Sequence, residues 1–284
     1  MISSENIKNL RLKTGAGMMD CKKALEENKG DLNAAADWLR KKGITTAQKK
    51  SSRDASDGLI TIEENRNHAV IIEINSETDF VARNEDFQIF CKKIARYALD
   101  KKIKDLNYLI DLDIIKADLT SMIAKVGENL VIKKLKFIGE GQSLVQKYIH
   151  GSVNSNSGKI GVVLDYTCNE SNTNLDDFTK NLCMHIAATD PKSLTREDLD
   201  LKLVDNEKEI YKEQLKNSGK PDEIIDKIVI GKINKYYEEV CLYDQFFVME
   251  NKKKIKEYII DFEKNNNYLF NIKNFTVFKV GDNL

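Results

Sequence analysis

The sequence between Val70 and Ala98 changes within a few residues from the spacing of a strand to the spacing of a helix. Val70, Ile72 and Ile74 alternate with their neighbours, which places them on one face of a β-strand. The apolar residues of 87–98 recur every three or four positions, which is typical of an amphipathic helix. A strand followed directly by a helix restricts this part of the chain to a mixed α and β fold.

Between these two runs, the seven residues Thr78–Asn84 form the most informative segment of the chain. They are expected to form a polar loop, yet Phe80 and Val81 lie at its tip beside the carboxylate of Asp79. Either the two apolar side chains fold back under the following helix, or they form a wedge that presses into another protein. The local pattern favours neither, and we take Thr78, Asp79, Phe80 and Val81 as candidate partner-binding residues.

The first 54 residues predict a module of three short helices. Thr14–Gly17 interrupts the first helix, and Met18–Asn28 forms the second. Asp31 is a suitable N-cap for a third helix, which Gly43 is expected to end before a polar linker at Ile44–Asp57. So few residues make a marginal core, which suggests that the module gains order from a partner.

Two adjacent methionines, Met18 and Met19, begin the second helix of this module. Neighbouring helical positions cannot both face the same small core, and methionine adapts well to binding surfaces. The alternative, that one or both fill the core, has equal weight.

The remainder of the chain predicts a second mixed unit. Its strands are expected at Gln146–Ile149 and Ile160–Tyr166, with a helix at Asp176–Ala188, whereas a further strand at Leu130–Ile138 belongs to the first mixed unit. This order loosely repeats that of residues 59–98, as in a duplication. We therefore predict an α+β protein with a three-helix module at 1–54, one core subdomain at 55–140 and another at 141–284. A helical hairpin is inserted at about 190–238, and it either joins two copies of the chain as a homodimer or stiffens its own subdomain.

Composition excludes several classes of protein. The 284 residues carry 45 Lys and Arg against 45 Asp and Glu, whereas a general nucleic-acid binder usually has a basic excess. The five cysteines are widely spaced without a CxxC pair, which is typical of reduced thiols inside cells. The longest apolar runs are far shorter than the roughly 20 residues that span a bilayer. We expect a cytoplasmic protein that contacts neither membrane nor nucleic acid directly.

Catalytic motifs are nearly absent. No phosphate-binding GxxxxGK[ST], no GxGxxG after a strand and no HExxH occurs, and no nucleophile stands beside a base. Of the three histidines, His185 lies within a predicted helix, where a role in packing is the simpler interpretation. We expect no enzyme, no cofactor and no metal site.

Several segments together closely resemble the elongation factor Ts family, the guanine-nucleotide exchange factors of elongation factor Tu. The similar segments are, in order, Leu10-Arg11, Thr14 to Leu25, Thr78 to Asn84 with Phe87, Gly127 to Asn129, Tyr148 to Gly151, Met184 to Ala188, Ser218 to Pro221, Gly231-Lys232 and Gln245 to Glu250. They cover nearly the whole chain, and the two long ones are specific.

The resemblance implies an N-terminal module like a ubiquitin-associated domain and a core of two related α+β subdomains. It implies that Arg11, Met18 and Met19 dock on the GTPase domain of elongation factor Tu, in its GDP-bound and nucleotide-free states. The Thr78–Asn84 segment would dislodge Mg²⁺ there, and GTP would end the complex. His150, in the second subdomain, would face the β-barrel part of elongation factor Tu.

The chain departs from the family pattern in three places. Phe246 stands where many members have proline, and Ser152–Ser157 looks like a small polar insertion. The sequence ends soon after Gly281, so we expect no additional C-terminal helical module of the kind that some members carry.

Other functions remain open on the sequence alone. The main alternative is a binding adaptor that uses the three-helix module to recognise ubiquitin-like proteins, without exchange activity. It leaves the Thr78–Asn84 segment unexplained. A nucleotide-hydrolysing enzyme and an RNA binder rank lower, because the first lacks a phosphate-binding loop and the second has only a short basic stretch at Arg40–Lys42 and Lys49-Lys50.

Overall fold

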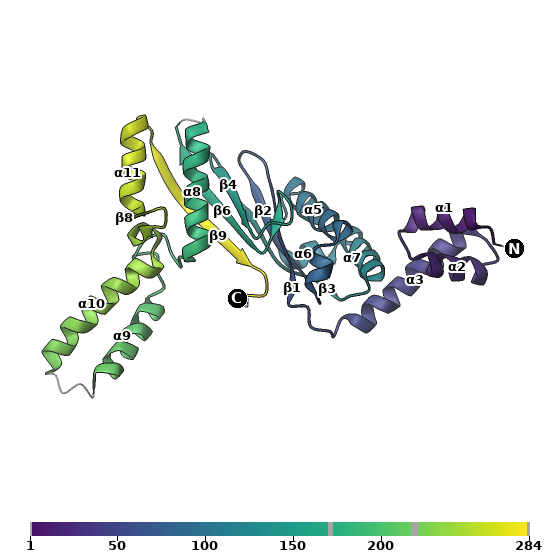
Figure 1. Cartoon of the computed structure of the whole chain (residues 1–284), viewed down its shortest axis with the longest axis horizontal. Coiled ribbons are helices and arrows are strands. Elements are labelled where there is room, and N and C mark those ends of the chain that lie inside the picture. Colours follow the sequence, from purple (N-terminus) through teal and green to yellow (C-terminus); the bar gives the residue numbers. More distant parts are fainter. Residues whose placement is uncertain (1, 170–172, 217–220, 283–284) are drawn as a thin grey trace. The chain divides into compact units, whose positions relative to one another are not determined.

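The computed structural model describes residues 2–169, 173–216 and 221–282. The chain divides into two compact units (Figure 1). Unit 1 comprises Met1–Ile138, Ile149–Gly161 and Phe278–Leu284, and unit 2 comprises Gly139–Tyr148 and Val162–Val277. Both units combine helices with β-sheets, which confirms the predicted α+β class.

The N-terminal part of unit 1 is a bundle of three helices, which we call the N-terminal module. They are α1 (Ser4–Thr14), α2 (Met18–Glu27) and α3 (Leu32–Lys50). Helix α1 ends at Gly15, whose φ of 68° is the left-handed conformation that glycine adopts readily. The fully buried residues that hold the bundle together are Leu10, Cys21, Ala24, Leu25 and Ala35.

Helix α3 does not end at Gly43 as the sequence predicts, but continues without a break to Lys50. At Gly43 it packs against α7 (Asp113–Val126), and a Cβ atom there would lie 3.5 Å from Ala124 and 3.6 Å from Thr120. Glycine is unfavourable within a helix, yet α3 continues through this position, where it packs against α7. Half of the predicted linker, Ile44–Lys50, is therefore helical.

The core of unit 1 is a four-stranded sheet in the order β3-β2-β1-β5. The strands are β1 (Asp57–Glu64), β2 (Ala69–Ser76), β3 (Leu130–Ile138) and the short β5 (Ser157–Gly158), and all pairs are antiparallel. Helices α5 (Glu85–Asp100), α6 (Leu106–Asp111) and α7 cover one face of this sheet, as Figure 1 shows. The large apolar residues of α5, such as Phe87 and Ile94, meet Val70, Ile72 and Ile74 of β2 in one continuous core.

Unit 2 is built on a three-stranded sheet in the order β4-β6-β9. These strands are β4 (Leu144–His150), β6 (Ile160–Cys168) and β9 (Phe270–Lys279). Helices α8 (Thr173–Thr189) and α11 (Ile255–Asn266) pack beside them, and the rings of Phe178 and Phe262 stack with centroids 3.7 Å apart. A small sheet joins β7 (Phe246–Phe247) to β8 (Glu250–Lys254), after a short 3₁₀ turn at Leu242–Asp244.

A pair of helices extends from unit 2, formed by α9 (Leu201–Leu215) and α10 (Asp222–Val240). They pack through a satellite core that includes Val204, Val229 and Ile233. Pro221 is the N-cap of α10, whereas the predicted turn residues Ser218-Gly219-Lys220 lie outside the described residues. A homodimer through this pair stays a prediction. Among the helices described, none is both long and apolar enough to cross a membrane.

His185 is fully buried in unit 2, which confirms the prediction that it packs in the core. Its Nε2 atom donates a hydrogen bond to the amide oxygen of Gln245 at 2.9 Å, and its Nδ1 atom accepts one from the backbone N–H of Val248 at 3.4 Å. These two partners together fit a neutral imidazole that carries its hydrogen on Nε2. Burial lowers the pKa of His185 below its usual value.

We expect unit 2 to lose stability as the pH falls below about 6.5, the ordinary pKa of histidine. In that range the unfolded chain binds a proton at residue 185 before the folded chain does, so protonation favours unfolding. Each unit by which the pKa is lowered corresponds to at most about 1.4 kcal/mol. Urea unfolding at about pH 7.5 and 5.5 should show a smaller pH effect for His185→Gln than for the wild type. His68→Gln is the matched control, and equal pH effects in all three proteins would contradict the prediction.

Candidate partner-binding site

The Thr78–Asn84 segment contains a single turn of helix, α4 (Asp79–Ala82), between the end of β2 and the start of α5. The sequence predicts a loop here, and the structure corrects this to a short helix. Asn84 begins the next helix, because its side-chain oxygen accepts hydrogen bonds from the backbone N–H groups of Asp86 and Phe87. The turn is thus confined between two rigid elements.

The two apolar residues of this turn have opposite environments. Val81 is 7% exposed and belongs to the core of unit 1, whereas the side chain of Phe80 is 79% exposed. The structure therefore combines the two alternatives that the sequence left open: one residue folds back and the other is displayed. Val81 anchors the turn, and Phe80 is the apolar side chain that a partner could contact.

Asp79 lies next to Phe80 and is partly exposed. Its carboxylate forms an ion pair with Arg83 one helical turn later, at 3.0 Å, and the arginine side chain is 74% exposed. An ion pair this open to solvent contributes little to stability. Asp79 can therefore exchange Arg83 for a hydrogen-bond donor on a partner at small cost.

Residues of the segment Gly127–Asn129, directly after α7, hold the start of the turn in place. The carboxylate of Glu128 accepts one hydrogen bond from the hydroxyl of Thr78 at 2.6 Å and another from its backbone N–H at 3.0 Å. The carboxylate of Glu77 in turn accepts a hydrogen bond of 2.6 Å from the backbone N–H of Asn129. That hydrogen bond, helped by the nearby charge of Arg53, lowers the pKa of Glu77.

The sequence pattern does not indicate the role of Glu77 and Glu128. The segment Gly127–Asn129 contributes to the family resemblance, but nothing in its spacing connects it with Thr78, which lies 50 positions earlier. Only the pairing of β2 with β3, from Ser76 with Leu130 onward, brings the two segments together.

The candidate docking residues of the N-terminal module all lie on its surface. Met18 is 57% exposed and Met19 is 74% exposed, so neither fills the core of the module. Arg11 is exposed on α1. The neighbouring Leu12, which the sequence did not single out, is 77% exposed and adds to the apolar surface.

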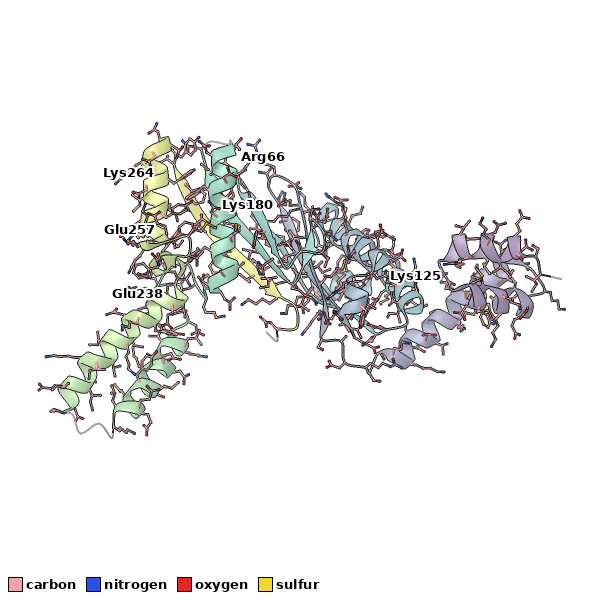
Figure 2. All side chains as sticks on the ribbon, viewed as in Figure 1. Arg66, Lys125, Lys180, Glu238, Glu257 and Lys264 are labelled. Carbon is pink, nitrogen blue, oxygen red and sulfur yellow. The ribbon has the colours of Figure 1, made fainter. Side chains whose placement is uncertain are left out.

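A cavity of about 510 Å³ brings part of the two predicted sites together. Arg11 from the module and Phe80 and Val81 from α4 all line it, along with Lys125 near the end of α7. Lys125, labelled in Figure 2, forms an ion pair with Asp86 of α5 at 2.7 Å. Met18 and Met19 do not line this cavity.

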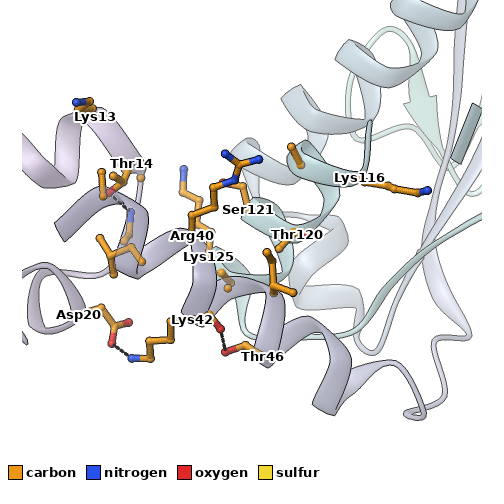
Figure 3. A pocket seen from close by; sticks show the side chains of 18 of the residues that line it. Lys13, Thr14, Asp20, Arg40, Lys42, Thr46, Lys116, Thr120, Ser121 and Lys125 are labelled. Carbon is orange, nitrogen blue, oxygen red and sulfur yellow. Dashed lines mark hydrogen bonds and ion pairs between the residues drawn. The ribbon is translucent and has the colours of Figure 1, made fainter. Parts of the chain in front are cut away.

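A second, larger cavity of about 830 Å³ lies between α3 and α7, as Figure 3 shows in close view. Arg40, Lys116 and Lys125 are among its basic lining residues. On the module side, Lys42 of α3 forms an ion pair with Asp20 of α2 at 2.5 Å. This pair ties α2 to α3, which is the helix of the module that packs on α7.

His150 lies at the end of β4 and is exposed. Its backbone carbonyl accepts a hydrogen bond from the N–H of Lys159 at 3.0 Å, which closes a turn through Ser152–Ser157. His150 is not among the residues that line either cavity. In the described part of the chain, no group of three or more His, Cys, Asp or Glu side chains is arranged to hold a metal ion.

Comparison with known proteins identifies the family of this chain. The family model described as elongation factor TS matches residues 77–282, which includes the exposed turn and the segment that holds it. The chain belongs to the elongation factor Ts family. It is 39% identical to elongation factor Ts from Clostridium botulinum (strain Alaska E43 / Type E3) over 291 aligned residues, which cover 100% of this chain and 94% of that protein.

Relatives in other bacteria are similar to the same extent. The elongation factor Ts proteins of Rhodospirillum centenum and Bartonella tribocorum are each 39% identical, over 100% and 99% of this chain and 94% and 93% of their own lengths. Family membership confirms the resemblance that the sequence motifs predict, and it identifies the chain as a translation elongation factor.

Proposed function

We propose that this elongation factor Ts family member is a guanine-nucleotide exchange factor that acts on elongation factor Tu. The observation that carries the proposal is the display of Phe80. Its ring is 79% exposed on a turn that Val81 anchors in the core and Glu128 holds from the side. A large apolar side chain that is rigidly presented to solvent is suited to a partner, because it gains most of its burial energy on binding.

The mechanism follows from the needs of the metal ion in the partner. Mg²⁺ bound with GDP requires near-ideal octahedral geometry and keeps several water ligands. Phe80, inserted between elements of the GTPase domain, would displace the groups that hold those ligands, and Asp79 would compete for nearby hydrogen-bond donors. The phosphate charge of GDP is then less well compensated, so GDP dissociates faster.

This exchange requires only binding energy. The chain must bind nucleotide-free elongation factor Tu more tightly than the GDP-bound form, and each tenfold difference corresponds to about 1.4 kcal/mol. The coupling is reciprocal, so nucleotide and exchange factor each weaken the binding of the other. GTP then displaces the factor. Since no bond is made or broken, the proposed activity is not enzymatic in the chemical sense.

We also propose distinct tasks for the remaining surface residues. Arg11, Met18 and Met19 dock the N-terminal module on the GTPase domain of elongation factor Tu, supported by their exposure on α1 and α2. His150 provides a weaker contact with the β-barrel part of the partner, supported by its exposed position at the end of β4.

The test is the release of a fluorescent GDP analogue from elongation factor Tu at fixed Mg²⁺ concentration. We expect catalytic amounts of this chain to accelerate release by at least about a hundredfold, which corresponds to roughly 2.7 kcal/mol of transition-state stabilisation. Release that is no faster with the folded chain than without it, from a partner shown to bind nucleotide normally, would refute the proposal.

A further inference from the structure

The contact between Glu128 and Thr78 consists of two hydrogen bonds. One carboxylate binds both hydrogen-bond donors of a single residue, the hydroxyl at 2.6 Å and the backbone N–H at 3.0 Å. Hydrogen bonds to an ionised acceptor are shorter and stronger than those between neutral groups. Two such bonds fix both the backbone and the side chain of Thr78.

We infer that Glu128 is a positioning residue for exchange: it sets the orientation of α4 and thereby of Phe80. This inference rests on the proposed function. Glu128 would not contact the nucleotide or the metal ion, and its effect would pass entirely through Thr78.

The turn needs such support because it is too short to hold its own shape. Helix α4 has four residues, far below the roughly 12 at which isolated helices become even marginally stable. Thr78 occupies the N-cap position, where a threonine oxygen usually accepts a backbone N–H of the first turn. Here the side chain makes no such capping bond, and its hydroxyl donates to Glu128.

A second contact beside the first strengthens the same connection. Glu77 accepts the backbone N–H of Asn129 at 2.6 Å, and the side-chain amide of Asn129 donates to the carbonyl of Arg53 at 2.7 Å. Asn129 is 4% exposed, so these bonds are shielded from water. The segment before α4 and the segment after α7 therefore each donate hydrogen bonds to the other and accept hydrogen bonds from it.

Glu128 also lies at the end of the helix that bears the N-terminal module. Gly127 closes α7 with a φ of 76°, and its carbonyl accepts a hydrogen bond from the ammonium group of Lys50 at the end of α3. The same two helices meet at Gly43. Helix α3 of the N-terminal module and helix α4 are thus connected through the segment Gly127–Asn129, in which Glu128 binds Thr78.

The experiment measures GDP release as a function of the concentration of this chain for Thr78→Val, Glu128→Ala and the double variant. Valine retains the β-branched shape of threonine and removes the hydroxyl. We expect each single variant to lower the maximal release rate about tenfold, with a half-saturating concentration within about twofold of the wild type. The double variant should be no slower than Glu128→Ala, because that change already removes the hydroxyl bond that Thr78→Val removes.

Two further variants separate positioning from general damage. Thr78→Ser retains the hydroxyl that Thr78→Val removes, and it should keep most of the maximal rate of the wild type. Glu209→Ala, which removes an exposed carboxylate from α9 in unit 2, should behave as the wild type. If Glu128→Ala proves unstable, the variants Thr78→Val and Thr78→Ser are sufficient to test the inference.

The outcomes distinguish this inference from the proposed function. Failure of the wild type to accelerate release would refute the proposed function, and the inference with it. An active wild type, a slow Phe80→Ala variant and wild-type rates for Thr78→Val and Glu128→Ala would overturn only the role of Glu128. A raised half-saturating concentration with an unchanged maximal rate would also overturn it, because the residue would then act in docking.

Discussion

Replacing Phe80 by alanine should lower the maximal rate of GDP release about 10- to 100-fold. Burial of a phenylalanine side chain in a partner contributes about 1.5–3 kcal/mol, and in this mechanism that energy is used to displace the metal ligands. The free protein should keep its stability, since the ring is 79% exposed and contributes little to the core. Stopped-flow release of a fluorescent GDP analogue, together with thermal unfolding of each variant, measures both effects.

The chain offers a matched control for this substitution. Tyr108 on α6 is an aromatic residue that is 60% exposed, and Tyr108→Ala should leave the rate unchanged. Asp79→Ala should slow release by a smaller factor, because it removes a competing carboxylate and only an exposed ion pair with Arg83. Wild-type rates in both Phe80→Ala and Asp79→Ala would eliminate the wedge mechanism.

Deletion of residues 1–54 should weaken the capture of elongation factor Tu by about a hundredfold, or roughly 2.7 kcal/mol. The deletion removes the exposed docking residues Arg11, Met18 and Met19 together with α3. The remaining sheet and its helices should stay folded, because their core is formed by residues from Leu59 onward. Surface plasmon resonance against immobilised nucleotide-free partner gives the affinity, and circular dichroism gives the integrity of the core.

A triple variant controls for the surface that the deletion uncovers on α7. Arg11→Ala, Met18→Ala and Met19→Ala combined remove the proposed contacts while leaving the packing of α3 at Gly43 intact. We expect this variant to lose most of the affinity that the deletion loses. Wild-type affinity in the triple variant would show that the module contributes by supporting α7 and not by docking.

The elements that could be predicted from the sequence are those with a regular apolar period. The strand ending before Thr78 and the helix beginning at Glu85 were predicted correctly. When one face of a strand or helix is buried, its apolar residues recur with the period of that element. The end of α3 was predicted wrongly. Glycine has a low intrinsic helix propensity, but the packing of α3 against α7 outweighs it, and that packing depends on residues far along the chain.

The candidate site was only partly accessible to the same reasoning. The sequence identified the exposed turn but could not separate Phe80 from Val81, because their exposure depends on the direction of a single helical turn. Glu128 was beyond reach for a different reason: its partner lies 50 positions away, and strand pairing brings them together. Local periodicity contains no information about such a contact.

The continuity of α3 has a kinetic consequence. A flexible linker would let the N-terminal module bind elongation factor Tu while α4 still searched a wide volume, whereas a helix of 19 residues extends about 28 Å without bending freely. Once the module has docked, α4 is presented at a high effective concentration in a narrow range of directions. The order of encounter would then be module first and turn second, and the time between the two contacts would depend on the stiffness of one helix.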